Sequence, residues 1–306
     1  MASDAVADPR IVPVLGRERE VELIQAALSS GTHTLLEGPP GTGKSTLLRA
    51  VAAAQHVDFI FVEGNAELTP ARLIGHFDPS QILERGYTPD IFIPGPLVEA
   101  LTTGALLYLE EINRIPEETL NVMLTVLSEG ELTVPRYGRI PAADGFAIVA
   151  AMNPFDGVGV ARLSSALHDR TCRIAVDYQS AQIEEQIVGL YVAGIPSGWR
   201  SQVVEVVRRT REHPDIRAGS SVRGAIDFAK LAAALATVRH VDVTDWQVGL
   251  DAALTALTGR ITLFESASKS AEQVVESIYA EVFGVQDDPQ DPSDGGDPAG
   301  EAGARS

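Results

Sequence analysis

One stretch of the chain combines glycines, a lysine and a hydroxyl side chain in a spacing that suits phosphate binding. Residues 38–45 read GPPGTGKS and fit the pattern G-x-x-x-x-G-K-[ST]. In this pattern backbone N–H groups and the positive end of the following helix bind phosphates, Lys44 neutralises the outer phosphates and the Ser45 hydroxyl reaches a magnesium ion. A plain glycine turn before a helix is the alternative. It is disfavoured because an apolar strand precedes the stretch and a helix follows it.

The pattern therefore predicts a nucleoside triphosphate site. Its expected binding residues are Gly38, Pro39, Pro40, Gly41, Thr42, Gly43, Lys44, Ser45 and Thr46.

A pair of carboxylates ends a second apolar run. Residues 106–109 (LLYL) are typical of a buried strand, and Glu110 and Glu111 follow directly. A carboxylate at this place holds magnesium in phosphate-transferring sites, which predicts that role for Glu110. Glu111 would then polarise the attacking water as a general base. A solvated acidic helix start before Pro116 is the alternative interpretation.

The elements that must position these groups alternate short apolar runs with amphipathic helical stretches up to about Tyr178, which indicates a parallel sheet with helices on both faces. Beyond residue 180 only helical stretches are expected. The predicted fold class is α/β, a doubly wound parallel five-stranded sheet with a smaller all-α lid domain. The expected strands are His33 to Leu36, Asp58 to Val62, Leu106 to Leu109, Ala147 to Met152 and Cys172 to Val176; the expected helices lie near 181–193, 199–212, 221–238, 244–258 and 268–283.

The organisation along the 306 residues follows from these patterns and from composition. We expect a flexible N-terminus (1–10), a nucleotide-binding α/β domain (11–178) and a helical lid domain (179–284). The segment 285–306 is rich in Asp, Pro and Gly and is expected to be a disordered acidic tail.

Charge and composition indicate which classes of binding partner and which cellular location to expect. The formal net charge is −18, of which the tail supplies −5, so the body repels phosphate backbones and nucleic acid is disfavoured as the main partner. No apolar run approaches the roughly 18 residues of a membrane span, and the N-terminus lacks a signal-peptide pattern. A cytoplasmic location is expected. The single cysteine, Cys172, lies in an apolar run and is predicted to be buried.

The order of motifs resembles that of AAA+ ATPases of the MoxR family over residues 11–260. Residues 14–18 (VLGRE) resemble the family's segment near the adenine, which implies nucleotide contacts for Leu15 and Gly16. Residues 110–114 (EEINR) resemble its D-E-I-N-R signature, with Glu110 where the family has Asp. The extra methylene brings this carboxylate closer to the metal.

Two further stretches resemble family elements that face the central pore of a ring. Residues 92–97 contain the F-x-P-G-P-L string of an insertion, and residues 130–140 resemble a hairpin with Arg136, Tyr137 and Gly138 at its tip. The resemblance implies substrate contacts for Arg136 and Tyr137. An ordinary surface hairpin is the alternative.

Three polar residues complete the site that the resemblance implies. Asn153 stands at the polar sensor position, although Asn before Pro is also an ordinary strand terminator. Arg170 matches the arginine finger offered to a neighbouring subunit; Thr171 replaces the usual aromatic residue, so Arg173 is the second candidate. Arg223, in the first turn of an expected helix, matches the second sensor.

The family resemblance implies Mg²⁺-dependent ATP hydrolysis by a homo-oligomeric ring, a hexamer, that remodels a client protein together with a von Willebrand factor A (VWA) domain partner. ATP and Mg²⁺ are the implied cofactors. Two alternatives stay open: an ATP-gated assembly or scaffold protein with slow hydrolysis, and a ring ATPase of the chelatase or helicase type.

Overall fold

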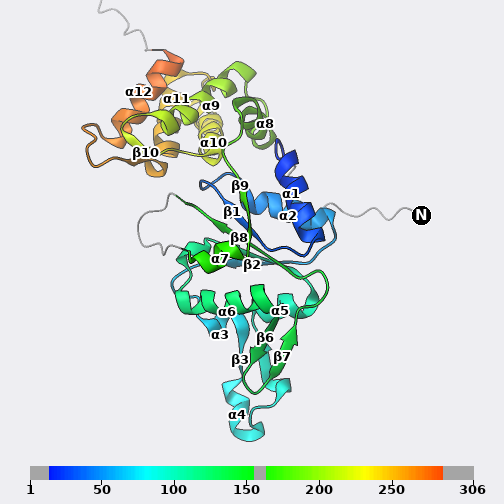
Figure 1. The fold of residues 1–306 in the computed structure, drawn as a ribbon. Helices are drawn as coiled ribbons and strands as arrows, with labels where there is room; N and C mark the ends of the chain where they lie inside the picture. Colours follow the sequence, from blue (N-terminus) through cyan, green and yellow to red (C-terminus); the bar gives the residue numbers. More distant parts are fainter. Residues whose placement is uncertain (1–13, 155–162, 285–306) are drawn as a thin grey trace, which may run out of the picture. The chain divides into compact units, whose positions relative to one another are not determined.

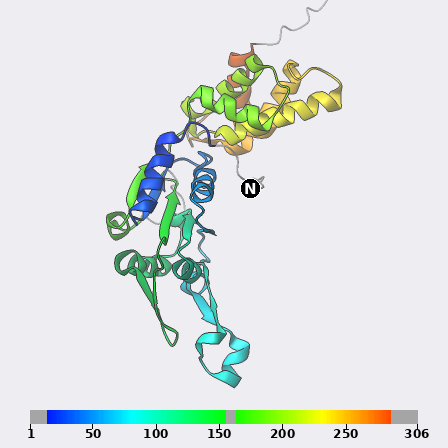
Figure 2. The ribbon, with the colours of Figure 1, turned by 90° about the vertical axis from the view of Figure 1, so that its right-hand side faces the viewer.

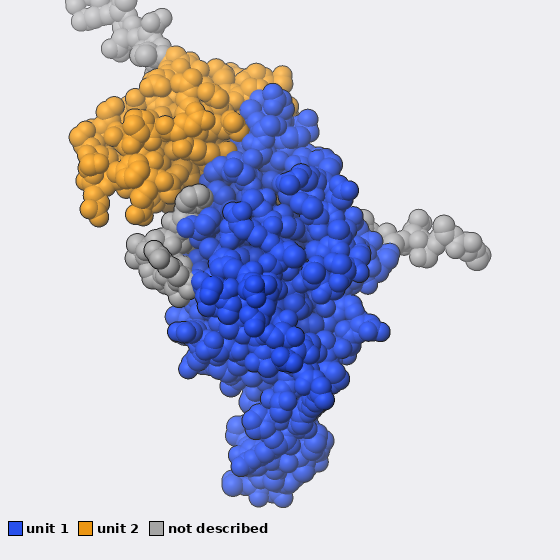
Figure 3. Space-filling model, viewed as in Figure 1, with its two compact units in different colours: residues 1–190, 221–223 blue, residues 191–220, 224–306 orange. Residues whose placement is uncertain are grey.

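The computed structural model describes residues 14–154 and 163–284, so the predicted flexible N-terminus and acidic tail lie outside the described residues. The chain divides into two compact units (Figure 3). Unit 1 comprises residues 1–190 with 221–223, and unit 2 comprises residues 191–220 with 224–306. The expected domain boundary near residue 178 stays a prediction.

Unit 1 is built on a five-stranded parallel sheet of order β2-β5-β8-β1-β9 (Figure 1). All five predicted strands are present, each within about one residue of its expected bounds, a precision better than element ends usually allow. The five-stranded parallel sheet is thereby confirmed. Its strands are β1 (Thr34–Glu37), β2 (Phe59–Glu63), β5 (Leu106–Glu110), β8 (Ala147–Met152) and β9 (Cys172–Ala175).

Helices cover both faces of this sheet, because alternate residues of the central strands point to opposite sides. On β5, Leu106 and Tyr108 join the core under α1 (Glu18–Ser29) and α2 (Lys44–Ala54). Leu107 and Leu109 join the opposite core, to which α3 (Pro70–Ile74), α5 (Pro96–Thr103) and α6 (Glu117–Glu129) contribute. The doubly wound arrangement is confirmed. Unit 1 also contains η2 (Ile112–Arg114), α7 (Ser165–Asp169) and all but the last residue of α8 (Ala181–Tyr191).

Two antiparallel hairpins extend from the same end of unit 1 (Figure 2). Phe92 and Tyr137 join them, with ring centroids 4.6 Å apart, and the Arg136 guanidinium lies 3.8 Å from the centroid of the Tyr87 ring. The predicted hairpin before β8 is confirmed, and Arg136 at its tip has a left-handed φ of 68°. The first hairpin is β3 (Gly75–Phe77) and β4 (Phe92–Pro94), separated by α4 (Pro79–Arg85) and η1 (Pro89–Ile91); the second is β6 (Glu131–Val134) and β7 (Gly138–Pro141).

The predicted burial of Cys172 is wrong. Strand β9 lies at the edge of the sheet, and Ile174 is its only buried residue, so Cys172 is exposed. An edge strand has a neighbour on one side only, and an apolar run in the sequence does not reveal that position.

Unit 2 is helical, as predicted, around a core that includes Trp199, Phe228 and Tyr279. Its elements are α9 (Ser197–Glu212), most of α10 (Val222–Arg239), α11 (Trp246–Leu257), η3 (Thr258–Arg260) and α12 (Ala271–Phe283). The expectation that strands stop beyond residue 180 is wrong, because β10 (Ile216–Ala218) pairs with β11 (Thr262–Leu263). Strands of three and two residues are too short to show an alternating pattern.

Across residues 14–154 and 163–284, none of the helices combines the length and the apolar character that crossing a membrane requires.

Candidate active site

The phosphate-binding stretch forms a tight loop between β1 and α2. Gly41 and Gly43 adopt left-handed φ values of 72° and 85°, which side chains disfavour. A Cβ on Gly38 would lie 1.9 Å from the carbonyl oxygen of Val176, so only glycine fits there. The backbone N–H groups of the loop therefore lie at the start of α2, where the helix dipole favours the binding of an anion.

Lys44 is the first residue of α2 and is held by the loop that it follows. Its Nζ donates to the carbonyl oxygens of Gly38 and Pro39 at 2.9 and 2.8 Å. The side chain is largely buried, which keeps the ammonium group within the loop. A bound phosphate would compete with these carbonyls for the same donor.

The two motifs predicted from the sequence come together at Ser45 and Glu110. Ser45 Oγ donates to Glu110 Oε1 at 2.8 Å, although 65 residues separate the two in the chain. Hydroxyl and carboxylate oxygens are the hard donors that Mg²⁺ prefers, and Mg²⁺ is usually held by one or two carboxylates together with phosphate oxygens. Ser45 and Glu110 therefore fit a magnesium site, and the longer side chain of Glu110 reaches the serine.

Glu111 occupies a strained backbone position beside Glu110. It has φ 54° and ψ 44°, in the left-handed region, and its carboxylate pairs with the Arg114 guanidinium at 3.1 Å. Gly64 makes room for this turn, since a Cβ there would lie 2.4 Å from the Glu111 carbonyl oxygen. Gly64 N–H also donates to the Glu110 carbonyl at 2.7 Å. Strain at a carboxylate that faces a pocket points to function.

Asn153 follows β8, the strand between β1 and β5. Its carbonyl accepts a hydrogen bond from Asn113 Nδ2 at 3.4 Å, and Asn113 is buried within the EEINR segment. The carboxyl ends of β1, β5 and β8 thus place their polar residues at one edge of the sheet, where ligands bind in open α/β sheets.

A pocket of about 450 Å³ opens at this edge, within unit 1. Arg223 belongs to the short segment 221–223 that clusters with unit 1, and a Cβ on Gly41 would lie 2.1 Å from Ser221 Oγ of this segment. The lining residues are Pro40, Gly41, Thr42, Gly43, Lys44, Ser45, Thr46, Glu63, Glu110, Glu111, Arg114, Ala151, Met152, Asn153 and Arg223. The pocket therefore brings together most of the residues proposed from the sequence.

Comparison with known proteins agrees with this geometry. Residues 33–171 match the family model of the AAA domain of the dynein-related subfamily. A protein of Staphylococcus epidermidis named only as uncharacterised is 30% identical over 233 residues, which span 72% of this chain and 85% of that protein. The chain belongs to the AAA+ ATPases.

A named relative and a solved structure are also similar to this chain. The gas vesicle ATPase GvpN of Haloferax mediterranei is 27% identical over 267 residues, 82% of this chain and 75% of that protein. A RuvB variant from Thermotoga maritima has a similar fold, with a TM-score of 0.52, 19% identity and coverage of 76% and 67% of the two chains. The sequence-based prediction of an ATPase is confirmed at the level of the AAA+ family.

Several predicted site residues of this AAA+ ATPase lie outside the pocket lining. Leu15 and Gly16 pack near α8, where Gln179 Nε2 donates to the Leu15 carbonyl at 2.6 Å. Gly38 and Pro39 belong to the loop, and their carbonyl oxygens accept hydrogen bonds from Lys44 Nζ. The adenine contacts of Leu15 and Gly16 stay a prediction.

The two arginine-finger candidates lie in different surroundings. Arg170 is exposed at the end of α7, where it donates to Ser128 Oγ and to the Ala166 carbonyl. Arg173 on β9 pairs with Glu37 at the end of β1. Arg173 thus has an acidic partner within the subunit, whereas the hydrogen-bond partners of Arg170 are uncharged; the choice between them as the arginine finger stays a prediction.

The sequence analysis missed the role of Arg17. This buried guanidinium donates to the Thr42 carbonyl at 3.1 Å, donates to the Asp177 carbonyl and pairs with Glu20 at 2.9 Å. It ties the phosphate loop to the segment after β9. The sequence signal was the place of Arg17 in the VLGRE segment predicted to lie near the adenine. Its role was not predicted because Thr42 and Asp177 are distant in sequence.

Tyr108, also missed, lies beneath the pocket. The side chain is fully buried, and its hydroxyl lies 3.4 Å from Ser45 Oγ. Burial, together with the nearby Glu110 carboxylate, raises the pKa of Tyr108 above its ordinary value. An aromatic residue within an otherwise aliphatic strand (LLYL) was the sequence signal.

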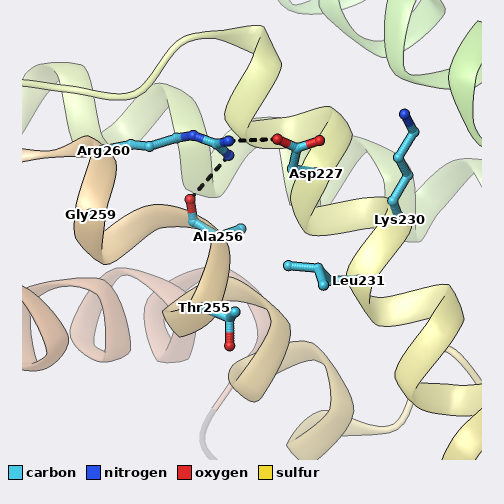
Figure 4. Close-up of a pocket in the computed structure, with 7 residues that line it drawn as sticks. All are labelled: Asp227, Lys230, Leu231, Thr255, Ala256, Gly259 and Arg260. Carbon is cyan, nitrogen blue, oxygen red and sulfur yellow. Dashed lines mark hydrogen bonds and ion pairs between the residues drawn. The ribbon is translucent and has the colours of Figure 1, made fainter.

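Unit 2 contains a second pocket of about 460 Å³, shown in Figure 4. There Arg260 is directed at Asp227, with an ion pair of 2.6 Å, and donates to the Ala256 carbonyl at 3.2 Å. Lys230 points away from this pair (Figure 4). The other lining residues are Leu231, Thr255 and Gly259.

Proposed function

We propose that this AAA+ ATPase is a MoxR-type, magnesium-dependent enzyme that hydrolyses ATP in the pocket of unit 1. The single observation that carries the proposal is the lining of this pocket, where Lys44, Ser45, Glu110, Glu111 and Asn153 meet. This set contains a phosphate-binding cation, two metal-compatible oxygens, a base and a polar residue that can orient water.

The residues would divide the reaction as follows. Backbone N–H groups of the loop and Lys44 bind the phosphates and stabilise the negative charge that develops on them. Glu111 accepts the proton of the attacking water, and Asn153 orients that water. Arg223 neutralises charge on the phosphates. Ser45 and Glu110 would hold Mg²⁺, which neutralises phosphate charge when it is bound.

The proposed assembly is a homo-oligomeric ring, a hexamer, in which Arg170 completes the site of the next subunit. Support comes from its exposure directly after α7 and from its place outside the pocket of its own chain. A guanidinium added in trans stabilises the transition state and makes hydrolysis depend on assembly.

The proposed work of the ring is chaperone-like remodelling of a client protein in the cytoplasm, with a VWA-domain protein as partner. The two joined hairpins at one end of unit 1 supply a surface on which a client could be engaged, with Arg136 exposed at a tip. The resemblance to the MoxR family supplies the client class and the partner.

Mixing two inactive variants tests the shared site. Arg170→Ala and Glu111→Gln should each bind ATP and each lose hydrolysis by at least about a hundredfold. Equal mixing should restore about one quarter of wild-type activity, because one quarter of neighbouring pairs then combine an intact Glu111 with an intact Arg170.

Arg19→Ala, at an exposed position on α1, serves as the control and should retain activity. A mixture that stays inactive would contradict a site completed by Arg170 of a neighbour.

One observation favours a second function, an ATP-gated scaffold with slow turnover. Glu111 is held by Arg114 in a strained conformation, which keeps the base from being free to turn toward water. If the assembled wild-type protein hydrolyses ATP no faster than Glu111→Gln while still binding it, the scaffold function holds and the motor function fails.

A further inference from the structure

Tyr108 places a phenol directly beneath the residues that would hold magnesium. Side chains two residues apart on a strand share a face, so Tyr108 and Glu110 of β5 both face α2 and its Ser45. Tyr108 Oη lies 3.4 Å from Ser45 Oγ, which in turn donates to Glu110 Oε1 at 2.8 Å. Three side-chain oxygens from two elements thus meet at one point.

The ring of Tyr108 is fixed by its surroundings. Phe59 and Phe61 of the neighbouring strand β2 contact it with ring centroids 5.9 and 5.7 Å away. The Arg49 guanidinium of α2 lies 4.8 Å from the centroid of Phe59 and 5.5 Å from that of Phe61. A rigid aromatic position gives the hydroxyl a defined place, because only the O–H bond remains free to rotate.

A fixed hydroxyl matters here because Glu110 has one more rotatable bond than the aspartate usual at its position. A longer carboxylate binds a metal in a defined orientation only if neighbouring groups restrict it. A buried phenol in turn requires a polar partner, and the Ser45 hydroxyl is one within reach.

We propose that Tyr108 is a positioning residue that orients the Ser45 hydroxyl and the Glu110 carboxylate to bind a hard divalent cation. This inference rests on the proposed function, since it assigns a part in the same site. The phenol acts through its two neighbours and does not touch the cation.

The test uses the full-length protein and a fluorescent ATP analogue. Its affinity is measured in EDTA and then over a magnesium titration for wild type and Tyr108→Phe. We expect an unchanged affinity in EDTA and an increase of about tenfold in the magnesium concentration at half-maximal effect, as for other groups that orient metal ligands. An unchanged magnesium dependence, or an equal loss of affinity in EDTA, would overturn the inference.

Tyr279→Phe is the matched control. Tyr279 of unit 2 is also fully buried, and its hydroxyl donates to the Trp246 carbonyl at 3.0 Å. Its loss should lower the melting temperature without changing the magnesium titration. A shift in the titration for this variant equal to that of Tyr108→Phe would also overturn the inference, because the shift would then report on stability alone.

A second variant protects the test against misfolding of Tyr108→Phe. Phe61 is 40% exposed and contacts the Tyr108 ring, so Phe61→Leu should fold and loosen the ring. A smaller increase in the required magnesium supports the inference, and no increase contradicts it. Lys44→Ala separates the two proposals: if it binds the analogue as tightly as wild type does in EDTA, the nucleotide site itself is misassigned.

Discussion

The two pockets have nearly equal volumes, about 450 Å³ in unit 1 and 460 Å³ in unit 2, yet they differ in how they are built. Five separate segments of the chain line the first, because parallel strands end at one edge of the sheet. Residues of α10, α11 and η3 alone line the second. The two pockets are therefore distinguished by the meeting of polar residues that are distant in sequence, and not by their volumes.

Charge separates the pockets as well. In unit 2 the cation Arg260 is paired with Asp227. In unit 1 Lys44 donates to loop carbonyls at the start of a helix, a place that favours an added anion. The loop N–H groups and the helix start, which the lining of the second pocket lacks although it contains Lys230, predict a phosphate ligand for the first pocket and none for the second.

Removing a lysine from each pocket should give the largest contrast. Lys44→Ala removes the cation of the proposed phosphate site and should lower ATP hydrolysis by at least about a hundredfold. Lys230→Ala removes the lysine of the second pocket and should leave hydrolysis unchanged. Steady-state phosphate release measures both. Near-normal activity of Lys44→Ala would exclude the pocket of unit 1 as the active site.

A glycine substitution should test the rigid loop of the first pocket. Gly38→Ala would force a Cβ against the Val176 carbonyl and should destabilise the fold by about 1–3 kcal/mol, the usual cost of overpacking. Gly198, near the start of α9, has open space where a Cβ would lie, with no atom within 4 Å. Gly198→Ala should therefore be neutral or slightly stabilising. Thermal unfolding compares them, and equal melting temperatures would contradict the tight loop.

The smallest effect is expected from the ion pair of the second pocket. Both side chains of the pair are 37% exposed, so Arg260→Ala should cost at most about 1 kcal/mol and leave ATP hydrolysis as in wild type. Urea unfolding and phosphate release measure the two quantities. A large loss of hydrolysis would give the second pocket a function that its paired charges do not suggest.

The sequence predicted the five-stranded sheet and the phosphate-binding loop because the signals for both lie within short stretches of the chain. Apolar runs marked all five strands, and the spacing of Lys44 and Ser45 marked the loop. The exposure of Cys172 was not predicted because it depends on which strand lies at the edge of the sheet. The pairing of β10 with β11 was not predicted because the two strands are distant in sequence.

Within the site, the same limit applies. Glu110 ends β5, and Glu111 and Asn153 directly follow strands, so the sequence predicted that they line the site, whereas Gly64 and Arg17 act through contacts with distant backbone. The sequence around Gly64 contains no signal for its close contact with the Glu111 carbonyl. Close approach between neighbouring strand ends emerges only from the folded sheet.

The aromatic contacts between the hairpins have a mechanical consequence. Since Phe92 packs on Tyr137 and Arg136 on Tyr87, the two hairpins are joined by side-chain contacts outside the five-stranded sheet, and we expect a displacement of one to move the other. Strand β7 of that hairpin leads within a few residues into β8, whose end carries Asn153. A displacement of either hairpin is therefore expected to reach Asn153, which lines the pocket of unit 1.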